Sequence, residues 1–543
     1  MTDSVADGAA AGSAGRAPET GAEPEREPAA RSPQGPRRAG GRPVTVAERL
    51  SGAATAPPPA TALERWPAAR PAKTARYAAV FAVVTAGIAV VNLDLFIVNV
   101  ALPSIGRSFH GTDLASLSWV LSAYAIVFAA LLVPAGRAAD LIGRRAAFLI
   151  GMVVFAVASA ACAAAPDVWV LVGARVVQAA GGALLIPASL SLLLAAAPPE
   201  RRTGAIRAWT SVGGAAAALG PVLGGALVAA SWHWVFLVNV PVVAIALLFG
   251  IRVLAPDRTA AGAEQQAVKE IRPDVLGAAV FTLAIGALAL ALVKADDWGW
   301  ASPRVLGGFA LAAVLIAAFI DRSARHPAPV IELHLLRRPV FATATAANVV
   351  FGIAFGAMLL LVTLWCQDVW GWSALRTGLG IAPGPLLVPF WAIAAGPIAR
   401  RIGPGPVAAL GCAIYACGCV FWRLNLSLVP DYPAHMLPGM LLTGTGVGLT
   451  LPTLVSAAVS AVPPNRFATG SGIVTMARQV GIVLGVAILV TVLGGHASGH
   501  DALPAFQRAT VVLAAAASAA GLASLLLVWA VGRERAPQAA GDS

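Results

Sequence analysis

Long apolar segments recur along the whole chain, and they constrain its fold more than any other feature. Each is about 20 residues long, enough to cross the hydrocarbon core of a bilayer as a helix, and short polar segments separate them. Of the 543 residues, 58% are hydrophobic and only 12% are charged, unlike a soluble globular domain. None of the segments alternates polar and apolar residues as a β-barrel strand does. The sequence therefore predicts an all-α integral membrane protein built of bundled helices.

The apolar windows predict fourteen transmembrane helices, and this even number places both termini on one side of the membrane. The predicted spans lie near residues 77–103, 116–135, 146–165, 168–196, 206–230, 234–253, 274–293, 305–321, 342–366, 375–398, 404–422, 434–461, 467–494 and 509–531.

Clusters of arginine predict which side is cytoplasmic. The segments after spans 2, 4, 6, 8 and 10 are rich in arginine and lysine, whereas the alternate segments hold few, so the positive-inside bias places both termini in the cytoplasm. Ten tryptophans at the opposite span ends agree with this topology, because tryptophan favours the headgroup level. The net charge of +12 is distributed over these small clusters rather than over one basic face, so we expect no nucleic-acid partner.

An internal repeat indicates two halves in parallel orientation. Residues 186–204 align without a gap on residues 451–469, and the prolines and one arginine of the first segment meet those of the second. Parallel halves with a site between them are typical of transporters. The predicted parts are a disordered cytoplasmic tail (1–75), an N-terminal six-helix bundle (76–255), two additional transmembrane helices with linkers (256–325), a C-terminal six-helix bundle (326–533) and a cytoplasmic tail (534–543).

Asp94 is a carboxylate in the middle of the first span. Such a residue costs roughly 2.5 to 3.5 kcal/mol on insertion scales and marks an ion pathway by default. Counting about 1.5 Å per residue from the predicted outer ends of the spans, Asp94 and Arg175 lie at the same depth. We expect Asp94 to carry a proton, with Arg175 and Gln178 as its polar partners. The alternative is a static ion pair that holds two spans together.

Five motifs resemble the major facilitator superfamily and, within it, the fourteen-span drug:proton antiporters. The resemblance covers nearly everything from about residue 80 to 530 and rests on Asp94, Asn99 and Pro103 in span 1; Gly136, Asp140, Gly143, Arg144 and Arg145 after span 2; Arg175 and Gln178 in span 4; Gly220, Pro221, Gly224 and Gly225 in span 5; and Arg478, Gly481 and Gly485 in span 13.

The resemblance implies two pseudo-symmetric six-helix bundles with two extra central helices. It also implies that the motif after span 2 is a cytoplasmic loop latch between the halves, although its arginines could simply set topology. The span 5 motif would limit leak or bias the sense of transport in an antiporter. From the residues themselves, Gly220 and Gly224 stand one turn apart with Gly225 beside them, which favours close helix packing, and Pro221 invites a bend.

Arg478 lies near the middle of span 13, and no acidic residue accompanies it there. Its partner must therefore come from another helix, for which Asp94 is a candidate, or from a substrate anion. The second half has no acidic residue in mid-span, which departs from relatives in the resembling family that have extra intramembrane acids and puts dicationic substrates in doubt.

These features predict a proton-coupled exporter of amphipathic drugs, antibiotics or related small organic molecules in the plasma membrane of a bacterium. The alternatives are an importer or facilitator of a polar solute and, from another class, a membrane enzyme or receptor. We expect no enzyme, since convergent catalytic groups are absent from the sequence pattern. We expect a monomer whose partners are its substrate, protons and lipid, with no cofactor and no metal; His496, His500 and Asp501 would make at most a weak metal site.

Overall fold

The computed structural model describes residues 71–198, 201–255, 273–463, 466–494 and 502–541. Most of the predicted tail (1–70) and the histidine pair at 496 and 500 lie outside these residues. The described part contains fourteen helical spans long and apolar enough to cross a membrane, as the sequence predicts, and it has no β-strand.

The first half consists of α1 (Pro71–Ser108), α2 (Leu114–Ile142), α3 (Arg144–Ala163), α4 (Val168–Ala196), α5 (Arg202–Ala230), α6 (Trp234–Leu237) and α7 (Asn239–Val253). The connecting pair is α9 (Val275–Val293) and α11 (Pro303–Arg325), joined by the short α10 (Ala295–Trp298). The second half consists of α12 (Pro339–Leu364), which continues as a π-helical turn (Trp365–Val369), then α13 (Ala374–Ile381), α14 (Pro383–Ile402), α15 (Pro404–Asn425), a π-helical turn (Tyr432–Met436), α16 (Leu437–Ser460), α17 (Phe467–Leu493) and α18 (Ala502–Gly541).

The helices are longer than the apolar windows that predict them. α1 begins at Pro71, so residues 71–75 of the predicted disordered tail are helical, and α18 continues to Gly541 through most of the predicted C-terminal tail. The predicted loop after span 2 is also largely helical: α2 continues to Ile142, and the chain turns at Gly143, whose φ of +97° favours glycine. Apolar windows report the lipid-crossing length alone, and a helix propagates beyond it.

The two halves repeat the same helix contacts. In the first half α1 packs on α5, α2 on α4 and α3 on α4; in the second, α12 packs on α17, α14 on α16 and α15 on α16. The turn glycines repeat as well, because the same number of residues separates Gly111 from Gly143 and Gly371 from Gly403, all with positive φ. These contacts agree with the parallel repeat read from the sequence.

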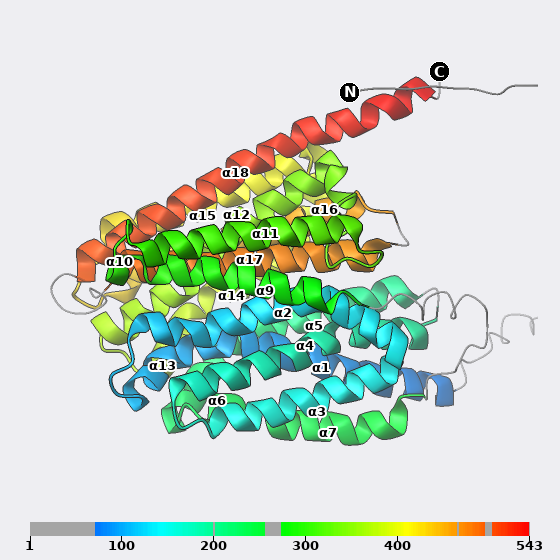
Figure 1. The fold of residues 1–543 in the computed structure, drawn as a ribbon, viewed down its shortest axis with the longest axis horizontal. Helices are drawn as coiled ribbons and strands as arrows, with labels where there is room; N and C mark the ends of the chain where they lie inside the picture. The colour runs from blue at the N-terminus through cyan, green and yellow to red at the C-terminus, as the bar shows by residue number, and fades with distance from the viewer. Residues whose placement is uncertain (1–70, 199–200, 256–272, 464–465, 495–501, 542–543) are drawn as a thin grey trace, which may run out of the picture. The chain divides into compact units, whose positions relative to one another are not determined.

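The halves meet through exchanged pairs of equivalent helices. α2 packs on α17, and α5 packs on α13 and α14. The extra helix α9 lies along the first of these pairs and contacts both α2 and α17, while α11 packs on α9 (Figure 1). At the end of the bundle where α1 joins α2, called here the Asp113 end, the Gln367 amide donates to the Val100 carbonyl over 2.8 Å. The opposite end, where α2 joins α3, is called the Gly143 end.

Candidate functional site

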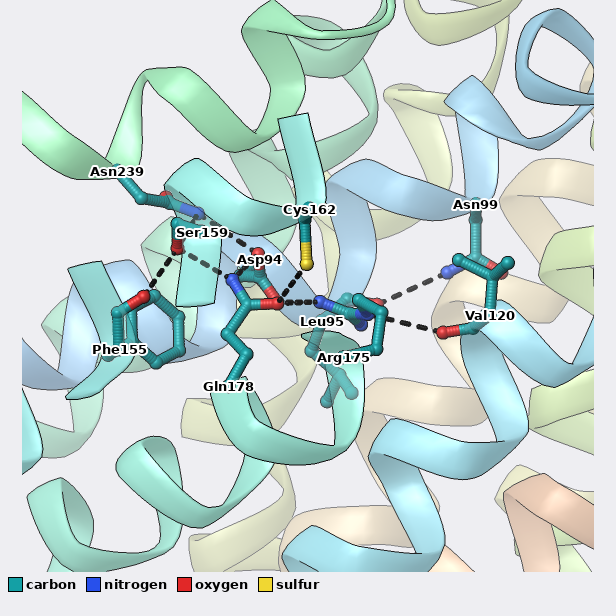
Figure 2. A network of polar contacts seen from close by, with 10 residues as sticks. All are labelled: Asp94, Leu95, Asn99, Val120, Phe155, Ser159, Cys162, Arg175, Gln178 and Asn239. Atoms are coloured by element: carbon teal, nitrogen blue, oxygen red, sulfur yellow. Dashed lines mark hydrogen bonds and ion pairs between the residues drawn. The ribbon is translucent and has the colours of Figure 1, made fainter. Parts of the chain in front are cut away.

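Asp94 lies at the centre of a buried polar network formed by five helices of the first half, α1, α2, α3, α4 and α7 (Figure 2). Its side chain is fully buried, and Arg175 from α4 is 1% exposed. The Arg175 guanidinium donates to one carboxylate oxygen, and Gln178 Nε2 donates to the other over 2.8 Å. Asp94 and Arg175, which are predicted to lie at the same depth, are therefore in direct contact. Gln178, one turn along α4, contacts the same carboxylate.

The network includes residues that the sequence reading missed. Asn239, the first residue of α7, donates from Nδ2 to Asp94 Oδ1 over 3.0 Å, and Ser159 of α3 accepts from Gln178 over 2.8 Å. Like Arg175, both residues lie within a few residues of the point where their span ends on the Asp113 side of the bundle. Their one signal in the sequence is a polar side chain near a span end, which many residues outside the network share.

Arg175 is held from several sides. Its Nε donates to the Val120 carbonyl of α2 over 3.2 Å, and its guanidinium lies 4.0 Å from the centre of the Tyr124 ring. Burial of an ion pair is tolerated when further hydrogen bonds and a cation–π contact satisfy the charges. The network thus fixes a carboxylate and a guanidinium inside the membrane at defined positions.

A cavity between the two halves reaches Arg175 but not Asp94. It is lined mainly by apolar side chains from α1, α2, α12 and α17, with Asn99 and Ser122 as further polar groups. The Phe96 and Phe355 rings, one from each half, lie edge to face with centroids 6.2 Å apart. Contents of this cavity would therefore meet the network at Arg175, which shields the carboxylate.

Comparison with known proteins decides the family. The profile of the Major Facilitator Superfamily matches residues 84–486. The chain belongs to the major facilitator superfamily. It is 34% identical to the multidrug resistance protein Stp of Mycobacterium tuberculosis (strain CDC 1551 / Oshkosh), over 76% of this chain and 75% of that protein. It is 32% identical to the tetracenomycin C resistance and export protein of Streptomyces glaucescens, over 75% and 74%.

Solved structures show the same fold. One, described as giving structural insights into substrate recognition in proton dependent oligopeptide transporters, superposes with a TM-score of 0.61 and covers 84% of this chain and 99% of that one. The identity is 16%, so this likeness concerns the fold alone.

The glycines of the span 5 motif lie where two helices touch α5. A Cβ atom added at Gly220 would come 2.7 Å from Phe96 of α1, and one at Gly225 would come 2.5 Å from the Ala374 carbonyl of α13. Gly224 meets the Ile97 carbonyl at 2.9 Å in the same way. The flat helix face predicted from the spacing is present, and it contacts both halves. Pro221 lies inside an uninterrupted α5.

The residues of the cytoplasmic-loop motif are brought together around the turn between α2 and α3. Asp140 and Arg144 form an ion pair of 3.6 Å with both side chains about half exposed, and Arg145 donates to the Ile251 carbonyl of α7 over 2.9 Å. Gly136 lies against Pro187 of α4. All of these contacts are within the first half.

A different acid joins the halves at the Gly143 end. Glu332, 5% exposed by its side chain, lies between α11 and α12 and contacts Arg137 of α2 at 3.4 Å and Arg466, the residue before α17, at 2.6 Å. From the sequence, Arg137 is interpreted as a topology signal and Arg466 as part of the internal repeat, and Glu332 is not singled out. Its position within an apolar stretch, PAPVIELHLL, was the available signal.

Proposed function

We propose that this chain is a proton-coupled exporter of amphipathic drugs, antibiotics or related small organic molecules, with Asp94 as its proton carrier. The observation that carries the proposal is a buried carboxylate whose guanidinium partner lines the cavity between the halves. Membership of the superfamily supports transport rather than catalysis, and the names of the two relatives support export.

Proton transfer to Asp94 would change the network in a defined way. The neutral acid no longer balances the charge of Arg175, and a buried charge without its partner is costly. The hydrogen bonds from Gln178 and Asn239 weaken as well, since bonds to an ionised acceptor are roughly twice as strong as neutral ones. The proton would therefore loosen contacts among α1, α4 and α7 next to the cavity, and its release would restore them.

We further propose that the chain lies in the plasma membrane with both termini in the cytoplasm, so that the Asp113 end faces outward. We also propose that it is a monomer and that it consists of the five parts whose bounds are given above. In this arrangement Gly220, Pro221, Gly224 and Gly225 seal the outer side by close packing. Gly136, Asp140, Gly143, Arg144 and Arg145 shape the cytoplasmic turn of the latch between the halves.

The test is proton-driven dye movement in everted membrane vesicles that contain the full chain. With an acidic interior, the wild type is expected to accumulate one or more dyes of a panel. Asp94→Asn is expected to reduce the rate of dye accumulation at least about tenfold, because a barrier raised by about 1.4 kcal/mol slows a step tenfold. Asp167→Asn is the matched control, because Asp167 is an exposed N-cap of α4 and asparagine caps equally well.

Undiminished movement in Asp94→Asn would remove this residue from the coupling step and favour the static ion pair. Movement in the opposite direction would favour an importer, and movement of no compound would speak against transport of this class.

A further inference from the structure

Arg478 is a charge in mid-membrane that has no counter-ion in the described part of the chain. It lies eleven residues into α17, roughly 16 Å from the start of the helix, and arginine stays protonated in proteins. Among the described residues its side chain takes part in no ion pair and no hydrogen bond, and its buried Nε has no acceptor. Asp94, the candidate partner from the sequence, is occupied by Arg175, Gln178 and Asn239.

Gln479, the next residue along α17, also lacks hydrogen-bond partners. Gln479 is fully buried, and neither its amide oxygen nor its amide nitrogen has a partner in the described part of the chain. A buried polar group without a partner costs about 1 to 3 kcal/mol, and more when it is charged. Two such residues in succession indicate that something absent from the protein itself satisfies them.

Arg478 belongs to a helix face that leads to the cavity. Ser471 is exposed, and Thr475, Arg478 and Ile482 are partly exposed, each about one turn from the last. Ile482 lines the cavity between the halves together with Phe96, Phe355 and Leu359. The arginine therefore stands about 6 Å along the helix from an apolar chamber that contains aromatic rings.

The balance of charges in the membrane interior also favours binding of an anion. The charged side chains in the middle of the described spans are Asp94, Arg175 and Arg478. The first two form a pair, so the centre of the protein carries one uncompensated positive charge. A cation placed there would meet repulsion, whereas an anion would neutralise the site.

We infer that Arg478 and Gln479 form a binding site for the anionic group of the transported substrate, which is an amphipathic organic anion whose apolar body lies in the cavity between the halves, beside the touching rings of Phe96 and Phe355. A sulfonate or carboxylate accepts hydrogen bonds from the planar guanidinium and from the Gln479 amide. The inference rests on the proposed transport function and adds the class of substrate to it.

The test compares two probes with one ring system. Binding of 1-anilinonaphthalene-8-sulfonate and of neutral N-phenyl-1-naphthylamine is titrated by fluorescence on the purified full chain in nanodiscs, with empty nanodiscs subtracted. The wild type is expected to bind the sulfonate at least about tenfold more tightly, and Arg478→Gln is expected to remove this preference. Arg423→Gln, a change at an exposed arginine at the end of α15, is expected to keep it.

Thermal unfolding separates this site from a structural role. Without any probe, Arg478→Gln is expected to melt at the same temperature as the wild type or a few degrees higher, because the change removes an unpaired buried charge. Should too little of that variant be purified for titration, Arg478→Lys and Gln479→Leu replace it, each with a severalfold loss of sulfonate preference. Equal binding of both probes to the wild type, a preference retained without Arg478, or a lower melting temperature of Arg478→Gln would each overturn the inference. Proton-driven movement in everted vesicles is measured separately from binding, so failure of the proposed function shows in movement alone, whereas failure of this inference shows in the wild-type preference for the sulfonate.

Discussion

Asn239 has a larger role than its residue type suggests, because its amide is one of three donors to a buried carboxylate. A hydrogen bond to a charged group is worth about 1.5 to 3 kcal/mol, so Asn239→Ala is expected to lower the free energy of unfolding by about that amount. The matched control is Asn425→Ala, which removes a hydrogen bond to the Phe421 carbonyl within one helix. Thermal unfolding of both variants in the same lipid checks this, and equal losses would contradict it.

Asp113 joins two roles at the N-terminus of α2. It accepts a hydrogen bond from the Ser116 backbone over 2.9 Å and pairs with Lys294 at 2.7 Å. Burial alone would raise the pKa of Asp113, but the hydrogen bonds from Lys294 and Ser116 outweigh it and hold this pKa below its usual value. Burial alone would lower the pKa of Lys294, but its hydrogen bonds to Asp113 and Asp297 outweigh burial and raise this pKa.

The lowered pKa fixes the pH dependence of this contact. Its stabilisation is complete above the unfolded pKa of about 3.9 and is lost as pH falls through the lower folded value. Because Asp113 is 48% exposed by its side chain, we expect Asp113→Asn to cost at most about 1 kcal/mol at neutral pH. Asparagine preserves the cap. Unfolding measured from pH 7 to pH 3 should show the difference between variant and wild type closing at the acid end, and a constant difference would refute the electrostatic origin.

Which residues meet was predictable only in part. The depths of Asp94 and Arg175 follow from helical rise alone, and the structure brings them together. Asn239 and Ser159 carry no charge, so nothing in their segments requires a partner. Glu332 was missed for another reason: it lies between spans, where an acid normally costs nothing, and its burial results from folding of the two halves around it.

At the scale of helices, the glycines of α5 determine how closely the halves approach. A Cβ at Gly225 would meet the Ala374 carbonyl, a backbone atom that cannot turn aside. We expect Gly225→Ala to destabilise the protein by about 1 to 3 kcal/mol, as overpacking does. Gly214→Ala in the same helix has nothing within 4 Å of the new atom, so it should be neutral or stabilising by up to about 1 kcal/mol. Thermal unfolding of the pair measures the contrast, and a similar loss in both would show that packing against α13 is not the cause.

Helix positions were predictable because about 20 apolar residues in a bilayer permit little else. The breaks within the spans were less predictable than the spans themselves. Pro383 at the start of α14 explains the interruption after α13. Pro241 in the first turn of α7 lacks the N–H that would bond to the Leu237 carbonyl, which explains the break at Val238 between α6 and α7. The contact that this break allows, between Asn239 and Asp94, depends on the packing of α7 on α1 and was not predictable from the segment.

For the whole molecule, the exchanged pairs α2 with α17 and α5 with α13 and α14 are related by the repeat of the two halves. At the Gly143 end, the contact between the halves depends on Glu332, which bridges Arg137 and Arg466. Without its charge, two arginines that are 29% and 46% exposed face each other with no acid between them. We therefore expect Glu332→Gln to weaken the closed arrangement of this end by about 1.5 to 3 kcal/mol.

Spin labels at Ile142 of α2 and Ser471 of α17, both exposed, measure this opening directly after replacement of the exposed native Cys417. In Glu332→Gln the distance distribution should gain a longer component, because a shift of about 1.4 kcal/mol changes a two-state ratio tenfold. His334→Asn is the control: His334 contacts the same carboxylate at 3.6 Å but is 60% exposed and bridges no second half, so its distribution should match the wild type. An unchanged distribution in Glu332→Gln would assign the contact between the halves to helix packing rather than to this acid.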